Sequence, residues 1–418
     1  MTKGEKTRSI PITQEMVRKA YEQVRRKGGS GGVDRISIAA FESDLDKQLY
    51  KIWNRLSSGS YFPPSVREVS IPKKDGSQRK LGIPTVGDRV AQQVLKSYVE
   101  PRLESIFVET SYGYRPLRSA HDAIGKVSEN VRSYAWVIDM DIKRFFDEVD
   151  HEKLLQGLSR HVEERWVLMY VRRWLEAPVL EPSGHERIKS GQGTPQGGVI
   201  SPLLANLFLH YAFDQWMLYS YAEVPFVRYA DDVIIHCRSK AQAQGLLTSV
   251  RDRLASCKLR LHEDKTRIVY CKDYRRHEQW GEHKFEFLGF SFQPRSIKSK
   301  SGGGMFLGYS CALSKSSKQK ILSELGGTNF QRWSSLTIED LAKCLNTKLS
   351  GWVNYFGRFG RRELLKVLRV FHRRLLKWVL QRYKNLKGSV KRGYAYLKQL
   401  QLGNRGLFYH WKKGYLTL

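Results

Sequence analysis

Two neighbouring aspartates, Asp231 and Asp232, interrupt the apolar segment "FVRYADDVIIHC" at 226–237. The two flanking arms are rich in β-branched and aromatic residues, which favour strands, so the aspartates are expected at or beside a tight turn between them. One aspartate in a turn is common. Two adjacent carboxylates inside a buried hairpin repel each other, and this is costly unless a positive charge lies between them. The segment therefore predicts a strand hairpin that binds a divalent cation.

A second pair of carboxylates lies about ninety residues upstream, in "WVIDMDIKRFF". Side chains alternate between the two faces of a strand, so Asp139 and Asp141 point the same way from a chain that is otherwise apolar. If this strand lies beside the hairpin, three or four carboxylates converge. Such a set suits two Mg²⁺ ions that clamp the attacking and leaving oxygens of a phosphoryl transfer. The strand pattern alone leaves both Asp139 and Asp141 as candidate ligands.

The charge of the chain points to a polyanionic partner. Lys and Arg number 72 and Asp and Glu number 41, which gives a formal net charge of +31 over 418 residues. A surplus of this size favours nucleic acid over an anionic membrane surface, since no apolar run is long enough to span a bilayer. The N-terminus also has no apolar stretch of signal-peptide length, so a cytoplasmic protein is predicted. The five cysteines form no C-x-x-C pair, which predicts neither disulfides nor zinc.

The pattern of elements changes twice along the chain. Helices are expected before residue 60, and a hairpin with a basic tip is expected over 61–83. Helices and strands then interleave, and after about residue 314 only helices are expected. The predicted helices cover 86–107, 152–175, 202–221, 241–258, 336–356 and 363–383, and the predicted strands include one that ends near Ile142 and a pair at 285–292. Because regular βαβ repeats are missing, an α+β fold is favoured.

The helix predicted over 363–383 has two different faces. Its apolar stripe steps by four and three residues, as a helix that packs on one side requires, and consists of Leu364, Leu368, Phe371, Leu375 and Trp378. The opposite face is cationic and carries Arg362, Lys366, Arg369, Arg373 and Lys377. A solvated surface would explain such a face, but few acidic residues follow Glu363, so nucleic-acid contact is favoured.

Two loops offer groups that suit a nucleotide. The basic tip in "IPKKDGSQRKLGIP" could grip a triphosphate with Lys73, Lys74, Arg79 and Lys80. Glycines in "GQGTPQGGVISP", at 191–202, let the backbone approach a ligand, and Gln196 offers an amide there. Phe145 and Phe146 follow the aspartate strand and could press against a sugar.

Taken in order, these segments resemble the group II intron-encoded reverse transcriptase/maturase family. "GGVDRIS" is similar to its N-terminal extension motif, "SIPKKDGSQRKLGIPT" to the fingers, and "SYGYRPLRSAHDAI" to a segment particular to the family. "DIKRFFDEVDH", "GTPQGGVISPLLANLFLH", "YADD" and "LHEDKTRIV" resemble the palm motifs, and "FLGF" resembles the primer grip. "LSGWVNYFG" and "GLFYHW" resemble the thumb/maturase region.

The resemblance implies a right-hand polymerase fold followed by a helical thumb/maturase domain. Four segments are expected: an N-terminal extension (1–60), fingers and palm (61–309), a thumb/maturase domain (310–385) and a basic C-terminal segment of the maturase region (386–418). Many relatives continue into a Cys/His-rich nuclease, and the chain stops at Leu418 without such a cluster. We therefore expect it not to cut the second DNA strand itself.

The resemblance also implies roles for individual residues. The metal ligands are Asp141, Asp231, Asp232 and the backbone of Ile142, and Asp139 has no such role. Lys265 resembles a lysine that protonates the leaving pyrophosphate. The incoming nucleotide is expected to contact Lys73 (or Lys74, by one step of register), Arg79, Phe146 and Gln196, with Phe146 excluding a 2′-hydroxyl. Primer and template are expected to contact Tyr229, Leu288 and Gly289.

The implied activity is that of an RNA-directed DNA polymerase with two Mg²⁺ ions, which uses dNTPs, a DNA primer and target DNA. The implied partner is a group II intron RNA, which the protein binds, helps to splice and copies into DNA during retrohoming. No membrane partner is expected, and action on DNA implies association with the bacterial nucleoid. Two alternatives stay open: a non-catalytic RNA-binding splicing cofactor, and a domesticated cellular reverse transcriptase in repair or phage defence.

Overall fold

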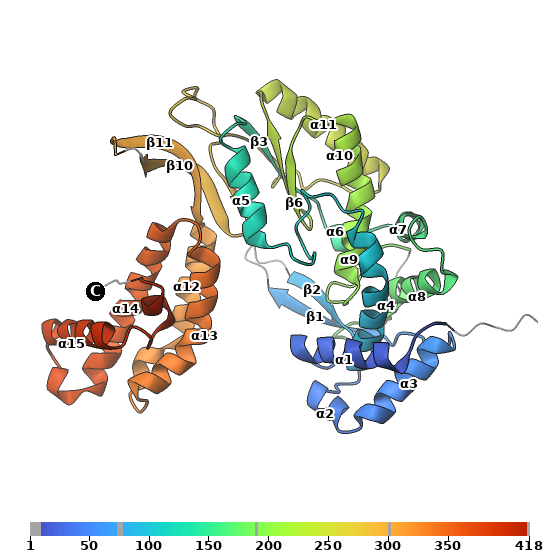
Figure 1. Cartoon of the computed structure of the whole chain (residues 1–418), viewed down its shortest axis with the longest axis horizontal. Coiled ribbons are helices and arrows are strands. Elements are labelled where there is room, and N and C mark those ends of the chain that lie inside the picture. The colour runs from blue at the N-terminus through green and yellow to red at the C-terminus, as the bar shows by residue number, and fades with distance from the viewer. Residues whose placement is uncertain (1–9, 73–77, 189–190, 300–301, 416–418) are drawn as a thin grey trace, which may run out of the picture. The chain divides into compact units, whose positions relative to one another are not determined.

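The computed structural model describes residues 10–72, 78–188, 191–299 and 302–415. Contacts between residues divide the chain into two compact units. Unit 1 contains Met1–Ser119, Met140–Ile235 and Lys240–Arg267, and unit 2 contains Ala120–Asp139, His236–Ser239 and Ile268–Leu418. Figure 1 shows the elements along the chain, from blue at the N-terminus to red at the C-terminus.

Helices precede residue 60, as the sequence predicts, and those in the described part of this segment are α1 (Gln14–Lys27), α2 (Ile38–Glu42) and α3 (Leu45–Ser57). The side chain of Thr13 accepts a hydrogen bond from the backbone N–H of Met16 and so caps the start of α1. One face of α1 is buried, and α1 packs against α4 (Val86–Glu104), which begins at the predicted position.

The predicted basic hairpin is confirmed for its two strands. β1 (Val66–Pro72) and β2 (Gln78–Ile83) pair antiparallel, and β1 also pairs parallel with β4 (Val179–Leu180), which pairs with β5 (Glu186–Arg187). The order in this sheet is β2-β1-β4-β5. Lys73 and Lys74, at the tip, lie outside the described residues.

A second sheet contains both aspartate segments. Its order is β6-β7-β3-β8, with β6 (Phe226–Tyr229), β7 (Asp232–Cys237), β3 (Trp136–Asp141) and β8 (Arg267–Tyr270). β6 and β7 pair antiparallel, so the predicted hairpin is confirmed. The strand of Asp141 is confirmed as well, and it lies directly beside the hairpin in the strand order.

Most helices around this sheet begin and end near predicted residues, but the short helix over 145–148 was not predicted. They are α6 (Phe145–Glu148), α7 (His151–Ser159), α8 (Arg165–Glu176), α9 (Ser201–Leu209), α10 (Gln215–Ser220) and α11 (Lys240–Ser256). Two predicted helices are interrupted. The segment 152–175 forms α7 and α8, which residues 160–164 separate, and the segment 202–221 is not a uniform α-helix. A π-helical turn, η1 (His210–Asp214), separates α9 from α10.

Unit 2 contains α5 (Ala120–Asn130) and a three-stranded sheet of order β11-β10-β9. β9 (Phe285–Phe287) and β10 (Phe290–Lys298) form the strand pair predicted over 285–292. β10 is longer than predicted, and it pairs along its whole length with β11 (Met305–Leu313), which the sequence pattern did not predict.

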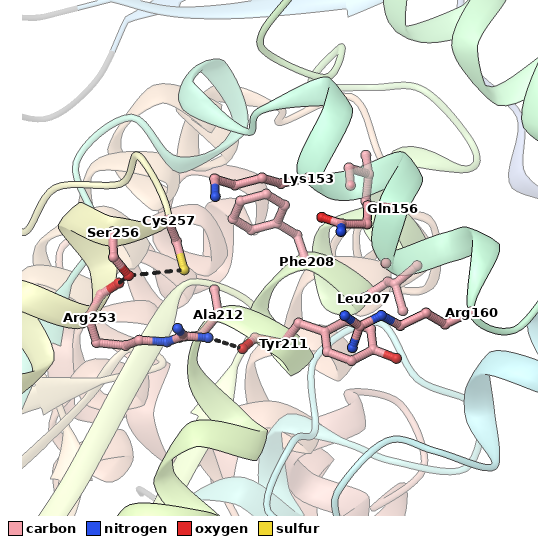
Figure 2. A pocket seen from close by; sticks show the side chains of 12 residues that line it. Lys153, Gln156, Arg160, Leu207, Phe208, Tyr211, Ala212, Arg253, Ser256 and Cys257 are labelled. Atoms are coloured by element: carbon pink, nitrogen blue, oxygen red, sulfur yellow. Dashed lines mark hydrogen bonds between the residues drawn. The ribbon is translucent and has the colours of Figure 1, made fainter.

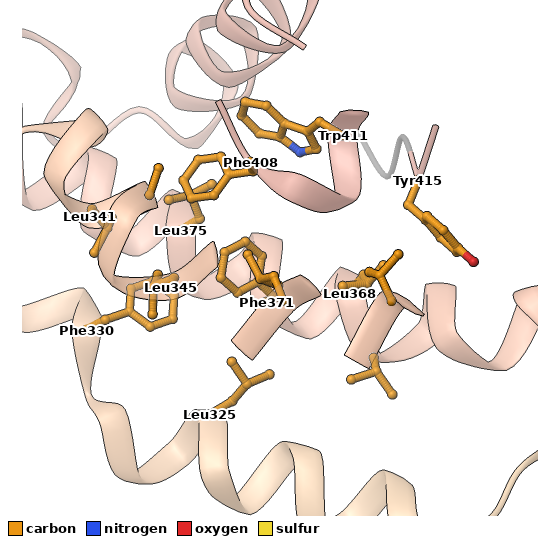
Figure 3. Close-up of a cluster of buried hydrophobic side chains, with 14 of the residues drawn as sticks. Leu325, Phe330, Leu341, Leu345, Leu368, Phe371, Leu375, Phe408, Trp411 and Tyr415 are labelled. Carbon is orange, nitrogen blue, oxygen red and sulfur yellow. The ribbon is translucent and has the colours of Figure 1, made fainter. Parts of the chain in front are cut away.

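Helices follow β11, as predicted: α12 (Lys315–Thr328), α13 (Ile338–Phe356), α14 (Arg361–Arg382), α15 (Val390–Gly403) and α16 (Tyr409–Lys412). Short 3₁₀ turns, η2 (Phe330–Arg332) and η3 (Lys384–Leu386), connect some of them. Their core gathers around Phe371, with Leu341 and Leu345 on one side and Phe408 and Trp411 on another (Figure 3). Within the described residues, no helix is both long and apolar enough to cross a membrane.

α14 has the two faces that the sequence predicts. Its apolar stripe is fully buried, with Phe371 and Trp378 at 0% exposure. The opposite side chains are all exposed, namely Arg362, Lys366, Arg369, Arg373 and Lys377. The helix is therefore anchored by its apolar side and presents cations to solvent.

Candidate active site

The two adjacent aspartates lie at the turn of the β6–β7 hairpin. Tyr229 pairs with Asp232, so Ala230 and Asp231 form a two-residue turn. Ala230 has a φ of 56°, which is left-handed and costs an alanine about 1 kcal/mol. Asp231 is half-buried and Asp232 is exposed. The predicted turn is thus confirmed, and only one of its two carboxylates is partly removed from solvent.

Asp141 ends β3, and three contacts hold its surroundings. Its carbonyl accepts a hydrogen bond from the N–H of His262 at 2.8 Å, and its N–H donates to Thr266 at 3.4 Å. The next residue, the buried Ile142, forms a bridge with Leu261. The segment that contains "LHEDK" therefore lies against the end of β3, and it brings Lys265 Nζ to 3.0 Å from Asp141 Oδ2.

Asp141 and Asp231 are electrostatic neighbours. Burial raises the pKa of Asp231, and the negative charge of Asp141 raises it further, while Arg79 and Arg228 act in the opposite direction. The strand arrangement predicted by the sequence therefore brings Asp141 close enough to influence Asp231. Asp139 has a different neighbour, since its charge contributes to raising the pKa of the buried Tyr309.

These carboxylates suit a divalent cation that shares its coordination with a substrate. Across the described residues, no three His, Cys, Asp or Glu side chains form a ready cluster around a metal position. Mg²⁺ usually takes one or two protein carboxylates, several waters and substrate phosphates, and it does not need an all-protein cage. A half-buried carboxylate with a like charge beside it fits such an ion.

The two segments that the sequence predicts to bind the nucleotide contact each other in the structure. Arg79 Nε donates a hydrogen bond of 2.8 Å to Gln196 Oε1, and the N–H of Gly82 donates to the carbonyl of Gln196 at 2.7 Å. Gly197 has a φ of +123°, and a Cβ there would lie 2.4 Å from the carbonyl oxygen of Gly82, so this contact requires glycine. Because Arg79 influences the pKa of Asp231, the pair lies near the hairpin turn.

Phe146 belongs to α6 and is nearly buried at 7% exposure. Its carbonyl accepts a hydrogen bond of 2.7 Å from the N–H of Thr194, in the same glycine-rich loop as Gln196. The ring of Tyr229, the last residue of β6, lies 6.4 Å from the ring of Tyr114. These predicted site residues therefore share unit 1 with Asp141 and Asp231.

Leu288 and Gly289 belong to unit 2, where they connect β9 to β10. Both have positive φ, at 49° and 79°. The hydroxyl of Tyr355 donates to the carbonyl of Leu288 at 2.9 Å, and the N–H of Ser314 donates to that of Gly289 at 3.1 Å. The turn is therefore held in a defined conformation by the helical part of its own unit.

The sequence pattern did not predict a buried charge pair beside the hairpin. Arg228 and Asp214 form an ion pair in which both side chains are fully buried. A signal was present, since Arg228 is a charged residue within an apolar strand arm. Its partner could not be found from the pattern, because Asp214 lies within the predicted helix 202–221 and resembles a residue of its exposed face.

A pocket of about 220 Å³ lies elsewhere in unit 1 (Figure 2). Residues of α7, α9, the π-helical turn and α11 line it, among them Lys153, Phe208 and Tyr211. None of the four candidate metal ligands, Asp141, Ile142, Asp231 and Asp232, lines this pocket. The carboxylate site is therefore distinct from it.

Comparison with known proteins gives two family matches. Residues 71–292 match the family described as reverse transcriptase (RNA-dependent DNA polymerase), and residues 318–396 match the group II intron, maturase-specific domain. The first match covers more than half of the chain. It agrees with the α+β fold, and the second falls on the helices α12 to α15.

Several individual proteins are similar to this chain. Protein YkfC of Escherichia coli (strain K12) is 33% identical over 58% of this chain and 73% of its own length. The group II intron-encoded protein LtrA of Lactococcus lactis subsp. cremoris is 35% identical over 40% of this chain and 27% of its own length. Among solved structures, telomerase from Candida albicans with a fragment of telomeric RNA matches at 14% identity and a TM-score of 0.47, over 92% of this chain and 70% of that one.

The assignment rests on the sequence matches, which cover both the sheet that contains the aspartates and the helical region that follows it in the sequence. The chain belongs to the reverse transcriptase family of RNA-dependent DNA polymerases, and it carries a group II intron maturase-specific domain.

Proposed function

We propose that this chain copies RNA into DNA at the β6–β7 hairpin and that it binds, helps to splice and copies a group II intron RNA. The observation that carries the polymerase proposal is the placement of Asp231 next to Asp141, with the Arg79–Gln196 pair nearby. A protein that only binds RNA has no use for converging carboxylates.

Asp141, Asp231, Asp232 and the carbonyl of Ile142 would hold two Mg²⁺ ions. Bound there, the ions would lower the pKa of the primer 3′-hydroxyl and neutralise charge on the phosphates during attack on the α-phosphate of a dNTP. Among the protein's own groups, Arg79 would bind the triphosphate as a bidentate donor, and Gln196 fixes the direction of that guanidinium. Lys73 would assist Arg79 there.

Phe146 would act on the sugar. Its ring is nearly buried, and its backbone is tied to the loop of Gln196, so it cannot move aside easily. A ribose 2′-hydroxyl would clash with it, which favours deoxynucleotides.

Lys265 would supply a proton to the departing pyrophosphate. Its ammonium pairs with Asp141 in this structure, so Lys265 must first exchange that partner for a phosphate oxygen. Tyr229, Leu288 and Gly289 would contact primer and template.

RNA binding would use the cationic face of α14, which lies within the maturase-specific match. Among the described residues, Lys366 pairs with Glu363 at 2.6 Å, and the other four cations have no carboxylate partner. Unpaired, exposed cations release counterions when they meet phosphates, and this drives binding. Action on DNA would place the protein at the nucleoid of a bacterial cell.

The test is extension of an annealed DNA primer on an RNA template with Mg²⁺ and dNTPs. We expect Asp231→Asn to abolish extension while RNA affinity is retained, because only the metal site changes. Asp252→Asn, an exposed aspartate on α11, makes the same charge change and should leave extension intact. Extension by Asp231→Asn at the wild-type rate would refute the metal assignment, and a wild-type chain that binds RNA without extending primers would favour the splicing cofactor.

A further inference from the structure

The π-helical turn η1 places one acidic side chain in the interior of unit 1. The N–H of Gln215 donates to the carbonyl of His210, five residues back, as in a π-helix. Asp214, at the end of this turn, is completely buried. Such turns often mark functional sites, because they cost stability relative to a regular α-helix.

Arg253, on α11, supports the π-helical turn through hydrogen bonds. Arg253 donates a hydrogen bond of 2.7 Å to the carbonyl of Tyr211 (Figure 2) and one of 3.0 Å to the carbonyl of Ala212. These are carbonyls within the irregular turn, where the regular helical pattern is broken. The position of Asp214 is therefore fixed by a contact from outside its own helix.

Asp214 binds the guanidinium of Arg228 through both of its oxygens. Arg228 Nε lies 2.7 Å from Asp214 Oδ1, and a second nitrogen donates to Oδ2. The remaining nitrogen donates to Asn206 Oδ1 at 3.0 Å and to the carbonyl of Ala230 at 3.1 Å. The planar guanidinium thus connects α9, the π-helical turn and the hairpin turn in one buried network.

The network also includes the segment 110–113, which contacts the hairpin. Asn206 Nδ2 donates at 2.7 Å to the carbonyl of Gly113, and a Cβ on Gly113 would lie 2.4 Å from the nitrogen of Ala230. Backbone bonds link Arg228 to Thr110 and to Tyr112, at 2.9 Å and 2.8 Å. The left-handed Ala230 is therefore enclosed by fixed groups, which is how a strained residue persists in a folded protein.

We propose that Arg228 is a positioning residue, which Asp214 and Asn206 hold so that it fixes the Ala230–Asp231 turn and, through it, the carboxylates that bind the catalytic metals. This inference rests on the proposed function. The bond to the carbonyl of Ala230 is the one that matters, because it joins the buried pair directly to the residue before Asp231.

Two variants separate a positioning role of Arg228 from a purely structural role of the buried ion pair. Replacing a buried ion pair by apolar residues of similar volume is often neutral for folding. The double variant Arg228→Met/Asp214→Leu should therefore fold, while it loses the bond to Ala230. Arg228→Lys keeps the positive charge, but an ammonium cannot span Asp214, Asn206 and Ala230 as the guanidinium does.

The experiment compares both variants with wild type, with Asp231→Asn and with Arg276→Lys. Arg276 is a half-buried arginine of unit 2 that binds the carbonyls of Val131 and Cys271, so it reports the cost of an Arg→Lys exchange elsewhere. Four quantities are measured: the midpoint of thermal unfolding, the affinity for an RNA–DNA primer–template, the rate of extension, and the affinity for Mn²⁺ by electron paramagnetic resonance. Mn²⁺ is titrated into a complex with a dideoxy-terminated primer and a dNTP.

We expect the double variant and Arg228→Lys to keep wild-type primer–template affinity and to lose about 10- to 100-fold in both Mn²⁺ affinity and extension rate, as is typical when the support of a metal ligand is removed. Arg276→Lys should change neither. Extension and Mn²⁺ affinity within threefold of wild type, in either variant, would overturn the inference. If the double variant does not fold, Arg228→Lys decides alone. If Asp231→Asn extends primers normally, the proposed function fails first.

Discussion

The cationic face of α14 gives the prediction with the clearest magnitude. Arg369, Arg373 and Lys377 are exposed, step by four residues along one face, and have no carboxylate partner among the described residues. Because the opposite face is buried, glutamine at these three positions should leave the helix in place. Each phosphate contact contributes about 0.7 to 0.9 to the slope of log affinity against log salt concentration.

Three lost contacts should therefore lower that slope by about 2 to 2.7. If the wild-type and variant lines converge near 1 M salt, the affinity of the variant at 0.1 M falls about 100-fold or more. Filter binding of structured intron RNA over a range of KCl concentrations measures both quantities.

A matched control tests whether position matters or charge alone. Lys47, Lys51 and Arg55 of α3 also step by four residues and are exposed. Their replacement by glutamine removes the same formal charge from a helix outside the maturase-specific match. An unchanged slope in the α14 variant, or an equal drop in the α3 variant, would refute a phosphate-binding role for the α14 face.

Two further predictions concern stability. Hydrogen bonds from Arg102 and then Tyr98 lower the pKa of Glu164 from 4.5 to about 2. The folded chain therefore binds this proton less readily than the unfolded chain, and ionised Glu164 stabilises the fold. The stabilisation is present above about pH 4.5 and is lost as the pH falls towards 2. After screening by solvent at the half-exposed Arg102 it amounts to about 1 kcal/mol, and Glu164→Gln should reduce the acid dependence of the unfolding midpoint in this window; an identical dependence would contradict the assignment. Leu117 is fully exposed with a φ of 58°, so Leu117→Gly should raise the urea midpoint by relieving about 0.5–1 kcal/mol of strain. Leu117→Ala keeps the strain and should not raise it.

The sequence was sufficient for the parts of the fold that follow from local periodicity. The β-branched and aromatic residues in 226–237 and the turn-forming aspartates predict the β6–β7 hairpin, and the steps of three and four along 363–383 predict both faces of α14. The strand pattern placed Asp139 and Asp141 on one face and could not choose between them. In the structure Asp141 influences Asp231, whereas Asp139 influences Tyr309, and this difference depends on which segments pack against each end of β3.

Features that depend on distant partners could not be predicted. β11 follows a glycine-rich segment and is defined by its pairing with β10, so its own residues give a weak signal. The π-helical turn adds a residue to a helix whose apolar pattern still looks regular. The Arg228–Asp214 pair joins positions fourteen residues apart that become neighbours only when the helix and the hairpin pack together.

The cysteines give the molecule one selective chemical handle. Cys237, Cys257, Cys271 and Cys311 are buried, and burial raises the pKa of Cys237 and of Cys271 to about 12. The thiolate is the reactive form, so these two thiols are almost unreactive at neutral pH. Cys344, on α13, is exposed. A maleimide dye should therefore label Cys344 of the maturase-specific domain faster than the buried thiols, without any engineered cysteine, and a fluorophore at this position would report on RNA binding to the wild-type chain.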